Sequence, residues 1–209
     1  MSRKHGFMLL PMLLFVLASP FTANAFPIAS VGTEGFQVIV ASVSDVIATY
    51  QGNSAAYSND LYLMLNGSGI PADDGILGND LFIFNNHTSA VGSTLDLGSF
   101  AVGTELIFRL FVNNTGYNYY TGPASRNPDG MAHARVQGNW LPNESLVSFE
   151  DLFGTPEGVN GYNDLSFSFT NTAPPPAVPE PTTLALLGLG VAGLIARKRP
   201  SKSRIDTRL

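Results

Sequence analysis

The chain of 209 residues contains no cysteine. Without thiols it has no disulfide bond, no thiolate nucleophile and no zinc–thiolate site. Its stability must come from the burial of apolar side chains. The roughly 150 residues between the two terminal segments are enough to form the core of one domain.

Basic residues are scarce in the central part of the chain. Between Phe26 and Ala177 there is no lysine, and three arginines (Arg109, Arg126 and Arg135) against fourteen acids give a formal charge of −11, compared with −5 for the whole chain. An acidic domain is repelled by nucleic acid and attracts cations. We therefore do not expect DNA or RNA as a partner.

The chain also lacks a C-terminal apolar run of full membrane-spanning length. Leu184–Ala196 is wholly apolar or glycine but shorter than the roughly 20 residues of a spanning helix. Before this run stands Pro179-Glu180-Pro181, where each proline fixes its own φ and disfavours helix in the preceding residue. After it stands Arg197-Lys198-Arg199. A hydrophobic run that ends in clustered positive charge behaves as a stop-transfer segment, with the basic end in the cytoplasm.

Residues 178–199 in this order resemble the C-terminal sorting signal of PEP-CTERM proteins. The resemblance implies that an exosortase processes the chain near Pro179-Glu180-Pro181. It also implies that a transmembrane helix anchors the chain before processing and leaves residues 200–209 as a basic cytoplasmic tail. The alternatives are an ordinary C-terminal membrane anchor and a buried core helix.

The N-terminus predicts export as well. Arg3 and Lys4 precede the largely apolar segment 7–21, and Ala23 and Ala25 supply an Ala-x-Ala pattern. This order is typical of a secretory signal peptide, here residues 1–25, cut by signal peptidase after Ala25. An uncleaved N-terminal anchor is the alternative.

Residues 26–170 predict an all-β domain, because short runs of Val, Ile, Phe and Tyr alternate with Gly, Asn, Asp and Ser. We expect a β-sandwich or jelly-roll-like fold, flanked by the N-terminal signal helix and the C-terminal hydrophobic helix. In 166–169, Ser and Phe alternate, which predicts one polar and one buried face. Residues 171–177 hold three prolines and predict an extended linker that cannot easily join a sheet. The expected strands are 36–42, 46–50, 61–65, 81–85, 105–112, 132–137, 146–149 and 165–170.

One loop gathers oxygen-bearing side chains. Two acids leave one expected strand, a glycine-rich loop follows, and an Asn-Asp pair enters the next strand. Such ligands around a flexible loop suit a hard cation such as Ca²⁺, although the EF-hand order of ligands is missing. In the alternative interpretation, the two acids accept hydrogen bonds from loop amides and help to close the hairpin. The candidate cation ligands are Glu150, Asp151, Asn163, Asp164 and Asp129.

The same loop carries a second resemblance. Together with 97–106 and 126–134, the segment Phe149–Leu165 resembles a domain of unknown function in bacterial surface proteins, which ends in Phe-Glu-Asp, an acidic glycine-rich loop and Asp-Tyr-Asn-Asp-Leu. The resemblance covers roughly 95–170. Here Val159 and Gly161 stand where such loops often carry acids, which removes candidate ligands. Asn-Asp-Leu also occurs at 59–61 and 79–81, where turns before strands explain it.

Catalytic motifs are missing. The expected domain has two histidines, His87 and His133, and no Gly-x-Ser-x-Gly, His-Glu-x-x-His or phosphate-binding glycine loop. Glu150 and Asp151 are neighbours that would point to opposite faces of a strand, so we do not expect them to share a glycosidase site. We expect no enzyme, and a hydrolase is the weakest alternative.

Four aromatic residues suggest a ligand. Tyr117, Tyr119, Tyr120 and Trp140 can stack on sugar rings, although packing within the core and hairpins also explains them. We therefore expect an exported cell-surface or extracellular-matrix protein with a structural or adhesive role, and the alternative is a module that binds extracellular polysaccharide. The expected partners are signal peptidase, exosortase, the membrane and extracellular polysaccharide.

Overall fold

The computed structural model describes residues 25–154, 158 and 161–173. The predicted signal peptide up to residue 24, the sorting segment and the basic tail lie outside the described residues. The described part forms strands and two single-turn 3-10 helices, η1 (Leu77–Asn79) and η2 (Ala124–Arg126). The strands are β1 (Val38–Val40), β2 (Ile47–Gly52), β3 (Asn59–Leu63), β4 (Leu81–Asn85), β5 (Thr94–Asp96), β6 (Glu105–Leu106), β7 (Phe108–Val112), β8 (Asn118–Tyr120), β9 (Ala134–Leu141), β10 (Glu144–Phe149), β11 (Leu165–Thr170) and β12 (Thr172–Ala173).

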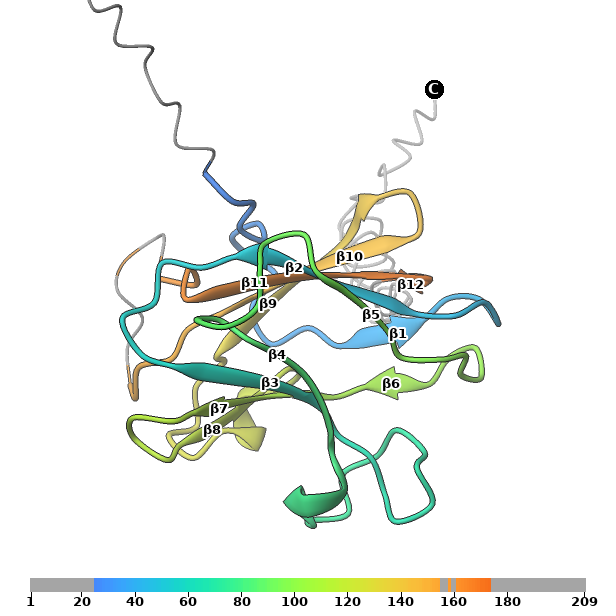
Figure 1. Cartoon of the computed structure of the whole chain (residues 1–209), viewed down its shortest axis with the longest axis horizontal. Helices are drawn as coiled ribbons and strands as arrows, with labels where there is room; N and C mark the ends of the chain where they lie inside the picture. The colour runs from blue at the N-terminus through green and yellow to red at the C-terminus, as the bar shows by residue number, and fades with distance from the viewer. Residues whose placement is uncertain (1–24, 155–157, 159–160, 174–209) are drawn as a thin grey trace, which may run out of the picture.

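The strands form three antiparallel sheets. The largest has the order β5-β2-β11-β10-β9, the second has the order β4-β3-β7-β8, and the third has the order β12-β1-β6. In Figure 1 the five-stranded sheet lies above the four-stranded sheet. The all-β prediction is confirmed at this level.

Aromatic side chains fill the space between the two larger sheets. Phe167 on β11 stacks on Phe84 of β4 with ring centroids 6.1 Å apart, and Phe169 stacks on Phe108 of β7 at 3.9 Å. All four belong to the buried hydrophobic core. Burial of each such ring contributes roughly 1.5–3 kcal/mol, so the phenylalanines of β11 help to hold the layers together.

Two expected strands have the predicted bounds, and one is divided. β4 and β11 match the predicted 81–85 and 165–170. The predicted strand 105–112 splits at Ile107, where β6 pairs with β1 and β7 pairs with β3. The carbonyl oxygen of Ile107 accepts a hydrogen bond from the Met64 amide at 2.9 Å. The chain therefore passes from one sheet to another within a single apolar run.

The sheet extends beyond the predicted end of the domain. Thr172 and Ala173 form β12 and pair with β1, although residues 171–177 were predicted to stay outside any sheet. The first proline of that segment is residue 174, so the amides of residues 172 and 173 remain free to pair. The prediction was wrong for these two residues.

The serine face of β11 is buried, not exposed. Ser166 and Ser168 have no accessible surface. The hydroxyls of Ser166 and Ser148 are 2.7 Å apart, and the Ala29 amide donates to Ser148 at 2.8 Å. The alternation of Ser and Phe alone would leave the serine face in water, but the N-terminal segment around Ala29 covers it. The serine hydroxyls form hydrogen bonds with one another and with the Ala29 amide, so these buried polar groups are satisfied.

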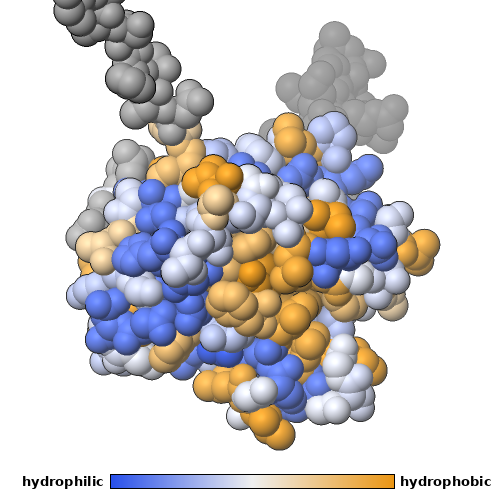
Figure 2. Space-filling view, viewed as in Figure 1, coloured by the Kyte–Doolittle hydropathy of each residue, from blue (hydrophilic) through white to orange (hydrophobic). Residues whose placement is uncertain are grey.

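Apolar side chains also reach the surface. The connection from β3 to β4 exposes Ile70, Ile76 and Leu77, and Phe82 follows on β4. Figure 2 shows orange side chains at the lower end of the molecule, where this connection lies in Figure 1. Within the described residues no helix is long and apolar enough to cross a bilayer.

Candidate functional site

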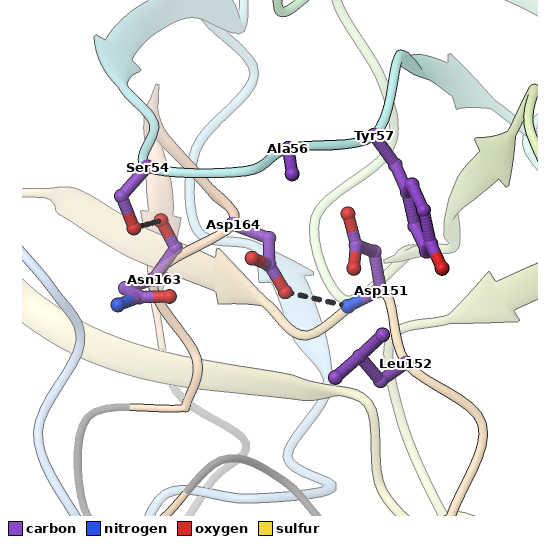
Figure 3. Close-up of a pocket in the computed structure, with 7 residues that line it drawn as sticks. All are labelled: Ser54, Ala56, Tyr57, Asp151, Leu152, Asn163 and Asp164. Carbon is purple, nitrogen blue, oxygen red and sulfur yellow. Dashed lines mark hydrogen bonds between the residues drawn. The ribbon is translucent and has the colours of Figure 1, made fainter.

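The candidate site lies where β10 ends and β11 begins. The last residue of β10, Phe149, pairs with the first residue of β11, Leu165. This register brings Asp151 and Asp164 together, although they are thirteen positions apart in the chain, and the Asp151 amide donates to Asp164 Oδ2 at 2.8 Å (Figure 3). The Asp164 amide in turn donates to the Phe149 carbonyl oxygen at 3.1 Å. These hydrogen bonds hold the Asp164 carboxylate against the backbone of Asp151.

Three carboxylates converge at this junction. Oxygen atoms of Glu150, Asp151 and Asp164 lie within 4.8 Å of one another, a grouping that can hold a metal ion. Glu150 and Asp151 are 1% and 4% exposed. Glu150 and Asp151 were expected to point to opposite faces of a strand, but β10 ends at Phe149 and both residues follow it. Alternation of side chains no longer applies there.

The cluster changes the protonation of Asp164. Burial, together with the charges of Asp151 and Glu150 and a hydrogen bond with Glu150, raises the pKa of Asp164 to about 8. The hydrogen bond from the Asp151 amide opposes this shift but does not overcome it. At neutral pH the site therefore favours either a proton or another positive charge among the three carboxylates.

An asparagine from a distant strand completes the cluster. Asn59 is the first residue of β3 and has no accessible surface. Its Nδ2 donates to Asp151 Oδ2 at 2.7 Å, whereas its Oδ1 has no hydrogen-bond partner among the described residues. Asn59 was predicted to lie in a turn before a strand. Its sequence motif, Asn-Asp-Leu, is shared with 163–165 and was the one signal that could have pointed to it.

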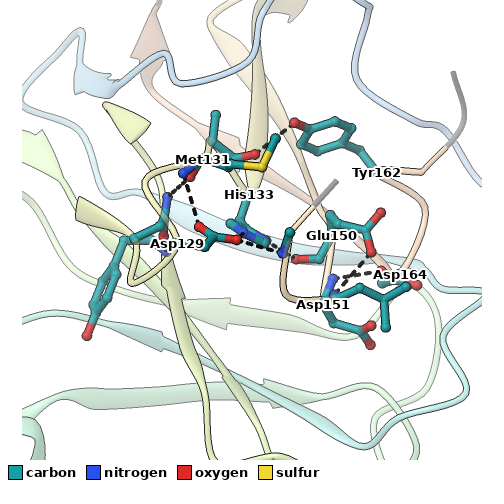
Figure 4. Close-up of polar contacts among 12 residues, drawn as sticks. Asp129, Met131, His133, Glu150, Asp151, Tyr162 and Asp164 are labelled. Atoms are coloured by element: carbon teal, nitrogen blue, oxygen red, sulfur yellow. Dashed lines mark hydrogen bonds and ion pairs between the residues drawn. The ribbon is translucent and has the colours of Figure 1, made fainter. Parts of the chain in front are cut away.

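Asp129 lies beside the cluster and has other partners. Its Oδ2 is 2.8 Å from His133 Nε2 and accepts the Gly154 amide at 2.8 Å, and its Oδ1 accepts the Met131 amide at 3.0 Å (Figure 4). Burial alone would raise the pKa of Asp129, but these hydrogen bonds outweigh it and hold the pKa below its ordinary value. Asp129 therefore anchors the loop and is not one of the converging carboxylates.

His133 connects Asp129 to the backbone of the cluster. Its ring is fully buried, its Nδ1 lies 3.1 Å from the Glu150 carbonyl oxygen, and the ring stacks on Tyr119 with centroids 3.7 Å apart. Both ring nitrogens lie within hydrogen-bond distance of oxygen atoms. His133 thus holds the end of β10 in place.

A hollow of about 310 Å³ opens beside the carboxylates. Asn163 lines it, and in Figure 3 its amide lies on the far side of Asp164 from Asp151. The Asn163 carbonyl oxygen accepts hydrogen bonds from the amide and the hydroxyl of Ser54 at 3.0 and 3.2 Å. Of the five predicted ligands, the structure brings three together, places Asn163 at the rim and assigns Asp129 to His133. The hollow is lined by Ser54, Ala56, Tyr57, Asp151, Leu152, Asn163 and Asp164.

The candidate sugar-stacking aromatics are divided. Tyr119 is fully buried and belongs to the core, whereas Tyr117 is exposed and packs against Phe153 at 5.1 Å between centroids. Tyr117 and Tyr120 line a second hollow of about 360 Å³ with Arg126 and neighbouring residues. Trp140 on β9 does not line it. The four residues therefore do not form one platform.

Each arginine of the described part has a carboxylate partner. Arg109 Nε lies 2.8 Å from Asp80, Arg126 NH1 lies 2.5 Å from Glu105, and Arg135 Nε lies 2.7 Å from Glu34. The side chains of Arg109 and Asp80 are 5% and 1% exposed. Anionic partners would therefore have to compete with these ion pairs for the positive charges of the described domain.

Comparison with known proteins identifies the C-terminal segment. The family model of the PEP-CTERM protein-sorting motif matches residues 177–199, which confirms the predicted sorting signal. No curated protein and no solved structure matches the chain. PEP-CTERM signals mark proteins for export and for membrane anchoring before processing by an exosortase. The chain carries such a signal.

Proposed function

We propose that this chain is an exported, non-catalytic surface protein with a structural or adhesive role. Signal peptidase removes residues 1–25, an exosortase processes the chain near Pro179-Glu180-Pro181, and the domain reaches the cell surface or the extracellular polysaccharide matrix. The observation that carries the proposal is the sorting motif at residues 177–199. The domain is a β-sandwich, and its ending in Tyr-Asn-Asp-Leu relates it to β-rich domains of bacterial surface proteins.

Two features support a role without catalysis. His133 is buried with both ring nitrogens facing oxygen atoms, and His87 is exposed on a turn. Neither has the arrangement of a general base next to a nucleophile. The exposed apolar side chains of the β3–β4 connection offer a contact surface, because exposed apolar patches often mark interaction sites.

Mass spectrometry of the mature C-terminus tests the sorting step. In cells with an exosortase we expect a C-terminus upstream of Arg197, and in cells without it we expect an intact Leu209. A Pro179→Ala/Pro181→Ala variant should stay unprocessed. The matched control, Pro175→Ala/Pro176→Ala, changes two prolines just upstream and should be processed normally. An intact Leu209 in both strains would exclude exosortase processing and would mean that the C-terminal segment is a simple membrane anchor.

A carbohydrate-binding module is the second candidate. The observation that favours it is the hollow lined by Tyr117 and Tyr120, since tyrosine rings suit a half-wet sugar interface. A glycan array with the purified protein separates the two roles. Glycan binding that is lost in Tyr117→Ala would favour the carbohydrate-binding module. Absence of binding to every glycan on the array would favour the structural role.

A further inference from the structure

We propose that Asn59, Glu150, Asp151 and Asp164 form a site for a hard divalent cation, with Ca²⁺ as the fitting ion. The site joins the start of β3 to the β10–β11 junction. Two independent observations support it: the convergence of three carboxylates within 4.8 Å, and the buried Asn59 amide, which contacts Asp151 and whose Oδ1 has no hydrogen-bond partner among the described residues. The proposal concerns the folded domain and does not depend on how the chain is sorted.

The charge of the cluster favours a cation. Three carboxylate groups share a small volume, and two of them are at most 4% exposed. Buried like charges repel one another strongly at low dielectric. A divalent cation among the three groups removes most of this repulsion.

The Asn59 amide also favours a bound cation. This side chain has no accessible surface and touches Asp151, yet its Oδ1 has no hydrogen-bond partner among the described residues. A buried acceptor without a partner is costly, and such groups call for a specific explanation. Nδ2 is the atom that faces Asp151, so rotation of the amide would turn Oδ1 toward the carboxylates. An amide oxygen beside carboxylates is an accepted Ca²⁺ ligand, and in that rotamer the ion would satisfy Asn59 as well.

The surrounding structure holds the ligands in place and leaves a path for an ion to reach them. His133 Nδ1 lies 3.1 Å from the Glu150 carbonyl oxygen, and the Asp151 amide donates to Asp164 Oδ2, so the backbone that carries the ligands is held in place. The hollow of about 310 Å³ beside Asp151 and Asp164 gives a path for the ion and room for water. Ca²⁺ accepts about six to eight oxygen ligands, so waters would complete its shell.

The ligand chemistry selects among metals. All four side chains offer oxygen atoms, and zinc favours histidine and cysteine ligands in its structural sites. Mg²⁺ requires a near-ideal octahedron and loses its waters reluctantly, whereas Ca²⁺ tolerates irregular sets. The irregular set here, which comes from a strand start and a hairpin junction, therefore fits Ca²⁺ better.

Isothermal titration of the full-length chain with Ca²⁺, after treatment with a chelator, tests the proposal. We expect saturable binding with one ion per chain, and Asp164→Asn should weaken the affinity about tenfold or more, because it removes one anionic ligand. The matched control, Glu144→Gln, changes a carboxylate at the other end of β10 and should bind as the wild type does. Circular dichroism confirms that each variant is folded.

A second variant separates coordination from structural support. Asn59→Asp places a further carboxylate beside Asp151, so it should lower the melting temperature in chelator, and Ca²⁺ should raise that temperature more than it does for the wild type. Absence of binding by the wild type at about 10 mM Ca²⁺, well above the affinities of extracellular Ca²⁺ modules, would overturn the proposal. Equal affinity of Asp164→Asn and wild type would overturn it too.

Discussion

Burial and two neighbouring acids strongly perturb the ionisation of Asp164. Its carboxylate is half-buried between the hairpin ends and beside two other acids. The pKa of about 8, against an ordinary 3.8, means that the folded chain binds this proton more tightly than the unfolded chain does. The resulting stabilisation is fully present below about pH 3.8 and is lost as the pH rises through about 8.

The Asp164→Asn variant measures this effect, because it removes the titrating group and keeps the shape. In chelator, we expect the variant to gain stability relative to the wild type between pH 5 and pH 9, by on the order of 1 kcal/mol after allowance for solvent screening. Urea unfolding at several pH values gives the difference. The pKa of Asp129 is lowered, so its contribution to the pH dependence of stability has the opposite sign. Because Asp129 is present in both proteins, this contribution cancels in the difference. Parallel stability curves would show that Asp164 ionises normally.

The residues of the candidate site differ in how well the sequence predicts them. Glu150, Asp151 and Asp164 flank one loop, so chain proximity and an expected hairpin were enough to group them. Asn59 is 92 positions from Asp151, and only the packing of β3 against the hairpin brings it there. Asp129 looked like a ligand by residue type, but its contact with His133 depends on the course of the 129–133 turn. Local patterns do not encode such contacts.

At the scale of elements, β11 decides how the layers pack. It lies between β2 and β10 in the five-stranded sheet, and its phenylalanines reach β4 and β7. Phe167 contacts Tyr50 at 5.4 Å between ring centroids as well as Phe84. Loss of this side chain would therefore leave a cavity that faces two sheets at once.

Phe167→Ala should destabilise the fold by about 3–5 kcal/mol, the usual cost of truncating a buried aromatic ring. The control is Phe82→Ala on β4, where the residue is 48% exposed and its ring centroid lies 5.5 Å from that of Tyr62. We expect this control to cost about 1 kcal/mol or less. Urea unfolding midpoints with unchanged slopes provide both numbers. Equal losses would mean that β11 is not the central link.

The sequence predicts elements well where hydrophobic alternation and turn residues agree. β4 and β11 have both signals and were predicted with their observed bounds. β5, β8 and β12 have two or three residues each, too few to show a period, and they were missed. The burial of Ser166 was also missed. Its partner Ser148 is covered by the segment around Ala29, which is 119 positions away from Ser148 in the chain. Tertiary contacts decide these features.

At the scale of the whole molecule, charge is divided along the chain. The basic residues cluster at the two ends, beside the apolar segments, whereas the domain between them is acidic and free of lysine. This division matches the export route that the sorting motif indicates, since positive residues flanking apolar segments remain in the cytoplasm. Inside the domain, the three arginines serve the fold through ion pairs.

Limited proteolysis with trypsin tests this organisation. Trypsin cleaves after lysine and arginine, and between Lys4 and Arg197 it can attack only at Arg109, Arg126 and Arg135. Arg109 and Arg135 lie on strands and are about 5% exposed, and Arg126 is held to Glu105 and to the Thr121 carbonyl oxygen. Cleavage requires local opening, which these contacts oppose. We therefore expect the folded, unprocessed full-length chain to keep the segment from 5 to 197 uncut under conditions that cut the urea-unfolded chain at all three arginines. Early cleavage after Arg126 would instead show that η2 opens independently of the sheets.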